Sequence, residues 1–223
     1  MTSTHKLALG LMIAASITAC KKDDDPEPST PATATTGTVK LEFEFFAGLA
    51  PYDLSTLLSD SVGMLMKFDQ VRFYVSNAKL RDMGGNEIAQ YNDKYLLVDA
   101  ANSENSIVLG AIAPQHVHDI TFNVGLDSLT NHQDPTQAEA PLNDATMHWG
   151  WNPMAGYKFI VLEGRFDGDG DDLITASDPG FIYHIATDAL LGERMLTFHQ
   201  DVAVGTTNTF AVHVDMTQVA AMV

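Results

Sequence analysis

The chain has 223 residues, with 12 Lys or Arg against 29 Asp or Glu, so its formal net charge is −17. A hydrophobic content of 45% suffices for a packed core and excludes a wholly disordered chain. The acidic balance argues against nucleic acid as a partner and against docking on anionic lipid, because both need clustered basic side chains. The single cysteine excludes an internal disulfide.

The N-terminus resembles a bacterial lipoprotein signal. Lys6 precedes an apolar run over residues 7–15 that is too short to span a bilayer. The run leads into Ile17-Thr18-Ala19-Cys20, which resembles a lipobox, so residues 1–19 are expected to be a signal peptide. Cys20 would then carry the lipid that anchors the mature chain. The alternative is a plain secretory signal with an incidental cysteine.

The next segment, residues 20–38, is predicted to be a solvated tether. It contains Lys21-Lys22, then Asp23-Asp24-Asp25, then a run rich in Pro, Thr and Ala. Such a run has little to bury, and proline favours an extended backbone. The basic pair followed by the acidic triplet is similar to an export signal of surface lipoproteins in Gram-negative bacteria. We therefore expect an outer-membrane lipoprotein of the cell envelope, facing either the periplasm or the cell surface.

Residues 39–223 show the period-two alternation of half-buried strands. In one of them a change of phase before Ala78 predicts a β-bulge. Residues 50–58 and 188–191 are expected to form single turns, and no long amphipathic helix is visible. The fold class is therefore predicted to be all-β, a single antiparallel β-sandwich domain with long irregular loops. The predicted strands are residues 39–45, 71–80, 95–98, 120–124, 157–162, 181–185, 195–198 and 210–214.

One long segment, residues 126–153, lacks a strand period. It contains Asn131-His132-Gln133-Asp134-Pro135 and, further on, Met147-His148-Trp149-Gly150-Trp151. A long irregular insertion in a compact domain is usually functional or disordered. Because the aromatic and methionine content argues against disorder, we expect the functional site here.

A series of short motifs runs in order through residues 39–218. Together these motifs resemble the copper-binding protein family related to the methanobactin-associated protein MbnP, and the resemblance covers most of the mature chain. The motifs are Phe73 to Leu80, Phe122 to Ser128, Asn131 to Thr136, Pro141 to Asn143 with Met147 to Trp151, Gly156 to Phe159 with Leu162 to Gly164, and Phe181 to His184.

The resemblance implies copper binding in the cell envelope, near His and Met ligands. It also implies that a tryptophan can be oxidised to kynurenine by a partner related to the di-haem peroxidases. The residue types suit this chemistry, because imidazole binds both copper oxidation states and thioether sulfur selects Cu(I). Trp149 is the first candidate for oxidation, since it lies beside His148 and near Met147, and Trp151 is the second.

The candidate copper ligands are His132, His184, Met147, His148 and His199. A metal between His132 and His184 would attach the insertion to the sandwich, and His199 is expected to lie across from His184. Each candidate has a structural alternative: an exposed loop histidine, a hydrogen-bonded strand histidine or, for the methionine, a core side chain. The structural alternative for the two tryptophans is that they form a hydrophobic lid.

The other strand histidines are not expected to bind copper. His116 and His118 lie two residues apart, which places both imidazoles on the same face of a strand. No third ligand for them is evident in the sequence, so both are expected to be exposed. His213 is expected to be a strand residue without a metal role.

An acidic segment offers a second candidate metal site. Asp167, Asp169, Asp171 and Asp178 would supply the hard oxygen ligands that calcium prefers. The segment departs from an EF-hand, because Asp172 replaces the glycine, Asp178 replaces the bidentate glutamate and no helices flank it. The alternative, a polar hairpin without metal, is the stronger interpretation.

The sequence contains no familiar catalytic motif: no G-x-S-x-G nucleophile, phosphate loop or zinc-protease histidine pair. Binding rather than enzyme activity is therefore expected, with copper stored, acquired or delivered. The alternative is a surface β-sandwich that binds a glycan or a protein partner through Trp149 and Trp151, with calcium as a structural ion.

Overall fold

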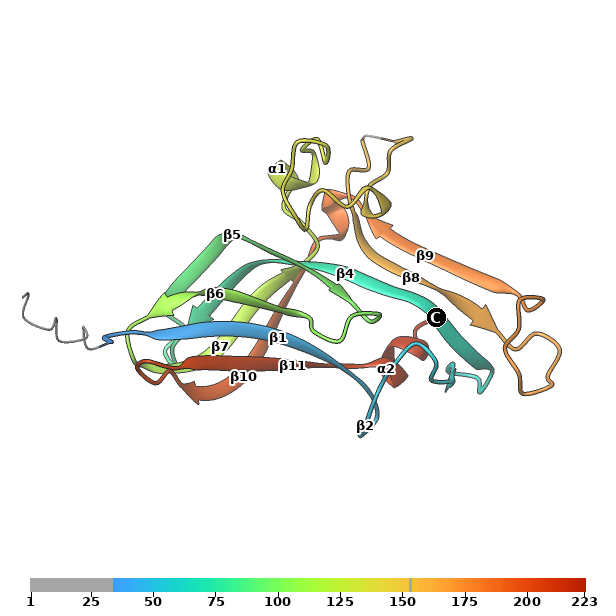
Figure 1. The fold of residues 1–223 in the computed structure, drawn as a ribbon, viewed down its shortest axis with the longest axis horizontal. Coiled ribbons are helices and arrows are strands. Elements are labelled where there is room, and N and C mark those ends of the chain that lie inside the picture. Colours follow the sequence, from blue (N-terminus) through green and yellow to red (C-terminus); the bar gives the residue numbers. More distant parts are fainter. Residues whose placement is uncertain (1–33, 153) are drawn as a thin grey trace, which may run out of the picture. The chain divides into compact units, whose positions relative to one another are not determined.

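The structure, a computed structural model, describes residues 34–152 and 154–223. These residues form two β-sheets and a few short helical segments (Figure 1). The expected signal peptide, Cys20 and most of the expected tether lie outside the described residues. Within the described part, no helix has the length and apolar character needed to cross a membrane.

The first sheet is built on β1 (Gly37–Ala47). This strand pairs in parallel with β11 (Thr207–Asp215) and antiparallel with β6 (Ser106–Ile112) and the two-residue β2 (Ala50–Pro51). The alternation predicted for β1 is present, because its apolar side chains are buried while its charged side chains are partly or fully exposed.

The second sheet runs in the order β10–β7–β4–β8–β9, with β3 and β5 also paired to β4. Its strands are β3 (Leu58–Ser59), β4 (Leu65–Arg81), β5 (Glu87–Asp99), β7 (His116–Val124), β8 (Lys158–Phe166), β9 (Gly180–Ala186) and β10 (Gly192–Asp201). The helical segments are α1 (Ser128–Asn131), η1 (Ala145–Met147), η2 (Asp188–Leu190) and α2 (Met216–Ala220).

The long strand β4 joins the two halves of the second sheet. One of its edges pairs with β5 over residues 72–81. The opposite edge pairs first with β8, over residues 66–73, and then with β7, over residues 75–81. β7 and β8 therefore follow one another along β4 and diverge from it (Figure 1). The irregular insertion connects these two strands, so it begins and ends at this fork in the sheet.

The two faces of β4 belong to different cores. The inward face contributes Phe73 to a core between the sheets, where Phe43 meets Phe73 and Phe122 edge to face at 5.8 and 5.5 Å. The opposite face contributes Tyr74 to a separate core beneath the insertion. A further core surrounds Phe68 at the start of β4 and includes α2.

Three alternate side chains on the outward face of β4 hold the insertion. The hydroxyl of Ser76 donates a hydrogen bond to the carbonyl of Gly125 (2.7 Å), and that of Tyr74 donates to the carbonyl of Pro141 (3.1 Å). Arg72 completes the row. Because strand side chains alternate between faces, every second residue of β4 contacts a different part of the insertion.

Arg72 is the charged member of this row and is nearly buried. Its guanidinium donates to Thr146 Oγ1 (2.7 Å), pairs with the Asp144 carboxylate, and has its Nε 3.0 Å from Asp99 Oδ2. Burial raises the pKa of Asp144, but hydrogen bonds from Thr146 and Arg72 outweigh it and leave the pKa below its usual value. The insertion is thus tied to β4 and to the end of β5 by one ion cluster.

The predicted all-β sandwich is confirmed. The bulge in β4 is confirmed as well, because the pairing with β5 shifts between Ser76 and Ala78, where Asn77 has a φ of +52°. Residues 188–191 contain the single turn η2, as expected. The parallel pairing of β1 with β11 is a departure from a purely antiparallel sandwich.

Other details of the strand assignment are wrong. Residues 50–58 contain a turn, as expected, but their ends also contribute to β2 and β3, and β5 begins at Glu87 rather than near residue 95. β6 has no counterpart among the predicted strands, because Gly110 interrupts its apolar pattern. That glycine faces the ring of Tyr91, which would lie 3.0 Å from a Cβ at this position.

Replacing Arg72 by Met tests the ion cluster. The change leaves Asp144 and Asp99 without their buried partner, so the free energy of unfolding should fall by about 3 kcal/mol. Both tryptophans of the chain lie in the insertion, so tryptophan fluorescence should report loss of its structure before circular dichroism reports loss of the sheets.

Arg81→Met, at the far end of the same strand, is the matched control and should behave as the parent. Coincident fluorescence and circular dichroism transitions at parental stability in the Arg72 variant would contradict the assigned role.

Candidate functional site

Asn131 connects the two ends of the insertion. Its side-chain oxygen accepts a hydrogen bond from the backbone N–H of Tyr157 (2.8 Å), and its Nδ2 donates to Asp188 Oδ1 (2.7 Å). Gly156 lies against this amide with a φ of +68°, and a Cβ there would stand 2.3 Å from Asn131 Oδ1. Both the backbone conformation and the close approach therefore require glycine at this position.

The core beneath the insertion is built on two tyrosines. The rings of Tyr74 and Tyr157 meet edge to face with their centres 5.8 Å apart, and the Tyr157 hydroxyl donates to the carbonyl of Leu142 (2.8 Å). Burial raises the pKa of both tyrosines, so both remain neutral donors at physiological pH. Met147 is fully buried in the same core. It therefore occupies the position of a core side chain, which was the alternative to its role as a copper ligand.

His132 and His148 line one groove of about 410 Å³. Nε2 of His132 lies 3.3 Å from Asp188 Oδ2, and the ring of His148 lies 5.0 Å from that of Tyr157. Burial lowers the pKa of His148, and the nearby Asp134 carboxylate offsets this only in part. The His148 imidazole is therefore neutral near pH 7 and keeps a lone pair available for a metal. The groove is lined by His132, Gln133, Asp134, Pro135, His148 and Gly150.

A second group joins β9 and β8 to the insertion. The ring of Trp149 lies 5.4 Å from that of His184 and 5.0 Å from that of Trp151, edge to face in both cases. The ammonium of Lys158 stands 5.2 Å from the centre of the Trp149 ring, within cation–π range. Trp149 is half-buried, whereas Trp151 is 77% exposed.

Two features of this second group are typical of a binding site. The indole Nε1 of Trp149 is buried and has no hydrogen-bond partner among the described residues, which is unusual for a buried donor. His184 Nε2 lies 2.7 Å from Glu163 Oε1, so the carboxylate holds the proton on Nε2 and leaves the lone pair on Nδ1. An unsatisfied donor and an oriented imidazole thus lie side by side.

The structure distributes the predicted ligands over two adjoining groups. His132 lies with His148, His184 lies with Trp149, and the chain between residues 148 and 149 connects the two groups. Neither His132 nor His184 belongs to a cluster of three His, Cys, Asp or Glu ligand atoms within 4.8 Å of one another in residues 34–152 and 154–223. A shared ion between His132 and His184 therefore stays a prediction.

The expected position of His199 across from His184 is wrong. β10, which carries His199, pairs with β7, whereas β9 pairs with β8, and these two pairs form separate branches along β4. A strand's own pattern does not reveal its neighbour, which explains the error. His199 instead lies beside His116 and His118.

Several site residues were not identified from the sequence, among them Glu163, Lys158 and Asp188. Glu163 reaches His184 because of the register between β8 and β9, in which Val161 pairs with His184. This register is not visible in either strand alone. The remaining strand histidine, His213, lies on β11 as expected for a strand residue, exposed and 3.2 Å from Glu44.

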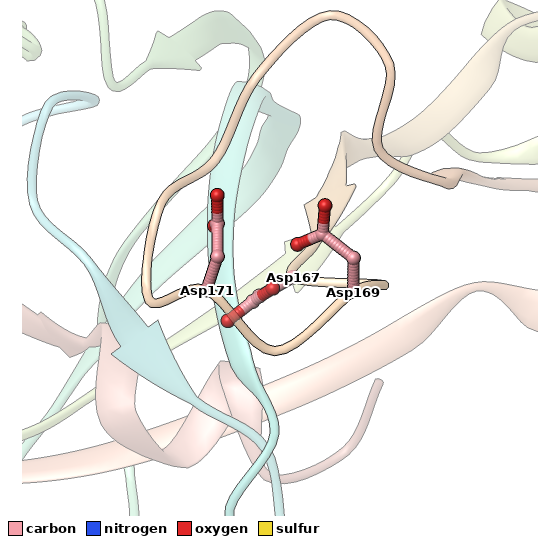
Figure 2. Close-up of side chains that lie close together, drawn as sticks. All are labelled: Asp167, Asp169 and Asp171. Carbon is pink, nitrogen blue, oxygen red and sulfur yellow. The ribbon is translucent and has the colours of Figure 1, made fainter.

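The acidic segment brings three of its four predicted residues together. Asp167, Asp169 and Asp171 each place one carboxylate oxygen within 4.8 Å of the others, on one turn of the loop (Figure 2). The charge of Asp171 raises the pKa of Asp169. The oxygens of Asp167, however, already accept hydrogen bonds from the N–H groups of Gly170 (2.7 Å) and Asp172 (2.9 Å).

Asp178 does not belong to that group. Its carboxylate accepts hydrogen bonds from the N–H groups of Gly168 (3.1 Å) and Thr175 (2.7 Å), and these bonds lower its pKa. The loop is therefore closed by its own hydrogen bonds, as the hairpin interpretation expects, and calcium stays a prediction.

Comparisons with known proteins identify relatives of the chain. The family model described as MbnP matches residues 36–222. Among solved structures, MbnP from Methylosinus trichosporium has a similar fold, with a TM-score of 0.51 and 18% sequence identity over 74% of this chain and 72% of that chain. No curated protein matches the sequence. Because the family match covers nearly all of the described residues, the chain belongs to the MbnP family.

Proposed function

We propose that this protein binds copper in the cell envelope, for its acquisition, storage or delivery, at the site formed by Trp149, His184 and the adjoining histidines. Membership of the MbnP family and the resemblance to copper-binding relatives support the choice of metal. One observation carries the proposal: the buried Nε1 of Trp149, which has no hydrogen-bond partner in the described part of the chain, lies beside an imidazole that Glu163 orients.

The available donors suit copper. Imidazole binds both oxidation states, and a carboxylate on the second ring nitrogen is the usual support of a metal-binding histidine. His148, with its lowered pKa, offers a neutral imidazole next to Trp149, and His132 lines the same groove. Because the Met147 sulfur lies in the core, we propose a set of imidazole donors rather than a thioether.

Trp149, rather than Trp151, is the residue that we propose for oxidation to kynurenine. Oxidative cleavage of the indole C2–C3 bond, with oxidising equivalents from a partner, followed by hydrolytic loss of C2 as formate would convert the ring N–H into an aromatic amine, which can turn toward a neighbouring ligand. Trp151 is mostly exposed. Its ring contacts that of Trp149, and it is the Trp149 ring that contacts His184. The resemblance implies a di-haem peroxidase-related partner as the source of oxidising equivalents.

The rival function is recognition of a glycan or of a protein partner. The exposed face of Trp151, stacked edge to face on Trp149, favours this alternative, because exposed aromatic rings bind sugars by stacking. Ligand binding that needs both tryptophans and is unaffected by chelators would favour this rival over copper.

A Cu(I) titration against a competing chelator tests the copper site. His184→Ala should weaken Cu(I) binding by at least about 10-fold, because it removes the oriented imidazole. His213→Ala changes an exposed strand histidine and is the matched control, with parental affinity expected. Intact mass should show any kynurenine mass change in the parent but not in Trp149→Phe.

Equal Cu(I) affinity of His184→Ala and the parent, with both variants folded, would overturn the copper site at Trp149.

We also propose that the protein is a lipoprotein of the outer membrane, anchored through Cys20. Cys20→Ser should move the protein from the membrane fraction to the soluble fraction, because lipidation requires the thiol. Ser29→Ala, in the expected tether, should leave the protein with the membranes. Full membrane retention of the Cys20 variant, measured by fractionation and immunoblotting, would rule out the anchor.

A further inference from the structure

Three histidines on β7 and β10 form a cluster that the copper site does not use. His116 and His118 lie two residues apart on β7, and His199 lies on β10, the strand paired with β7 (Figure 1). The ring of His199 has its centre 4.2 Å from that of His118 and 6.0 Å from that of His116. The fold therefore supplies the third imidazole that the sequence of β7 lacks.

A β-bulge places His199 in this cluster. The pairing of β10 with β7 shifts between Thr197 and Gln200, so Phe198 and His199 together stand opposite His118. Phe198 packs against the core between the sheets, which leaves His199 on the outer face. His199 also has a φ of +51°, a left-handed conformation that is costly for a residue with a Cβ and is concentrated at functional sites.

Two carboxylates lie on the Nδ1 side of the β7 imidazoles. Nδ1 of His116 is 2.7 Å from Asp201 Oδ1, and Nδ1 of His118 is 2.9 Å from Asp119 Oδ2. Although the Asp119 carboxylate lies this close, His118 Nδ1 is buried and has no hydrogen-bond partner among the described residues. The other oxygen of Asp119 accepts a hydrogen bond from Thr197 (2.7 Å). The carboxylate bonded to Nδ1 of His116 leaves Nε2 of that ring available, as in metal-binding histidines.

We propose that His116, His118 and His199 form a second metal site, which binds a divalent late transition-metal ion through their imidazole nitrogens. Imidazoles that share one tetrahedral ion have ring centres roughly 5 Å apart, because each metal–nitrogen bond is about 2.0–2.1 Å long. The distances of 4.2 and 6.0 Å lie on either side of this value. Within residues 34–152 and 154–223 the ligand atoms of the three histidines do not all lie within 4.8 Å of one another, so binding one ion requires side-chain rotations that bring the imidazole nitrogens together.

The donor set determines the class of ion. Three imidazoles without sulfur suit Cu²⁺ and Zn²⁺ rather than hard ions such as Ca²⁺, and Cu²⁺ is the tighter of the two in the usual affinity order. The side chains of His116 and His118 are 39% and 23% exposed, so an ion reaches them from solvent. The cluster lies on the branch of the sheet formed by β7 and β10, whereas His184 lies on the branch formed by β8 and β9, so we expect the two sites to bind independently.

Zn²⁺ titration of the mature full-length protein by calorimetry tests this site, with His184→Ala as background to remove the copper site. The background variant should bind one Zn²⁺. Adding His118→Ala or His199→Ala should weaken that binding by at least about 10-fold, whereas adding His213→Ala should not change it. Thermal melts without metal should show that each substitution leaves the fold intact. If His118→Ala destabilises the fold, His118→Gln provides a second variant.

Two results would overturn the proposal. One is the absence of Zn²⁺ binding in the His184→Ala background. The other is loss of binding with His118→Ala but not with His199→Ala, which would leave only a two-histidine surface chelate. Cu(I) affinity of His118→Ala should equal that of the parent, so failure of this site is distinguishable from failure of the copper site at Trp149.

Discussion

The outward face of β4, from Arg72 to Ser76, is the constraint on which the functional site depends. The inward neighbours of these residues, such as Phe73, are fixed in the core between the sheets, so the outward row has no freedom to shift. Each member of the row binds a different part of the insertion. Because a buried ion pair gains little net stability once its desolvation is counted, Arg72 acts chiefly to set the position of the insertion.

The fork along β4 explains why a long irregular segment can present side chains reproducibly. β7 and β8 leave β4 in different directions, and the insertion fills the outer surface between them with a core of its own around Tyr74 and Tyr157. A side chain of the insertion also bonds the backbone where the chain re-enters the sheet, since Asn131 accepts a hydrogen bond from the N–H of Tyr157. The site then draws Trp149 from the insertion and His184 from β9, which is typical of binding residues on loops that a rigid sheet supports.

Features that depend on local pattern could be predicted from the sequence. The alternation of β1 and the phase change near Ala78 identify a strand and a bulge without any knowledge of neighbours. The insertion was likewise predicted to hold the site, because it contains Trp149 and His148, and this stays a prediction. Cys20 and its lipid lie outside the described residues and stay predictions.

Features that depend on strand order could not be predicted. The partners of Arg72 and of His184 lie many residues away in the chain, and only the register of the sheet brings them together. For the same reason His199 was assigned to the wrong neighbour, because consecutive strands β9 and β10 are not paired with one another. β6 was not predicted, because Gly110 interrupts the apolar pattern of its sequence. The reason for this glycine, its close packing against the ring of Tyr91, is visible only in the fold.

The parallel pairing of β1 with β11 has a consequence for how the domain folds. Residues 38–46 find their partners at residues 207–215, so one edge of the first sheet stays open until nearly the whole chain has emerged (Figure 1). Closing such a distant contact is slow, because the loop entropy is lost before the contact forms. Meanwhile β1 exposes an alternating apolar edge that is prone to pair with other chains. The first sheet is therefore completed only once β11 is available to pair with β1.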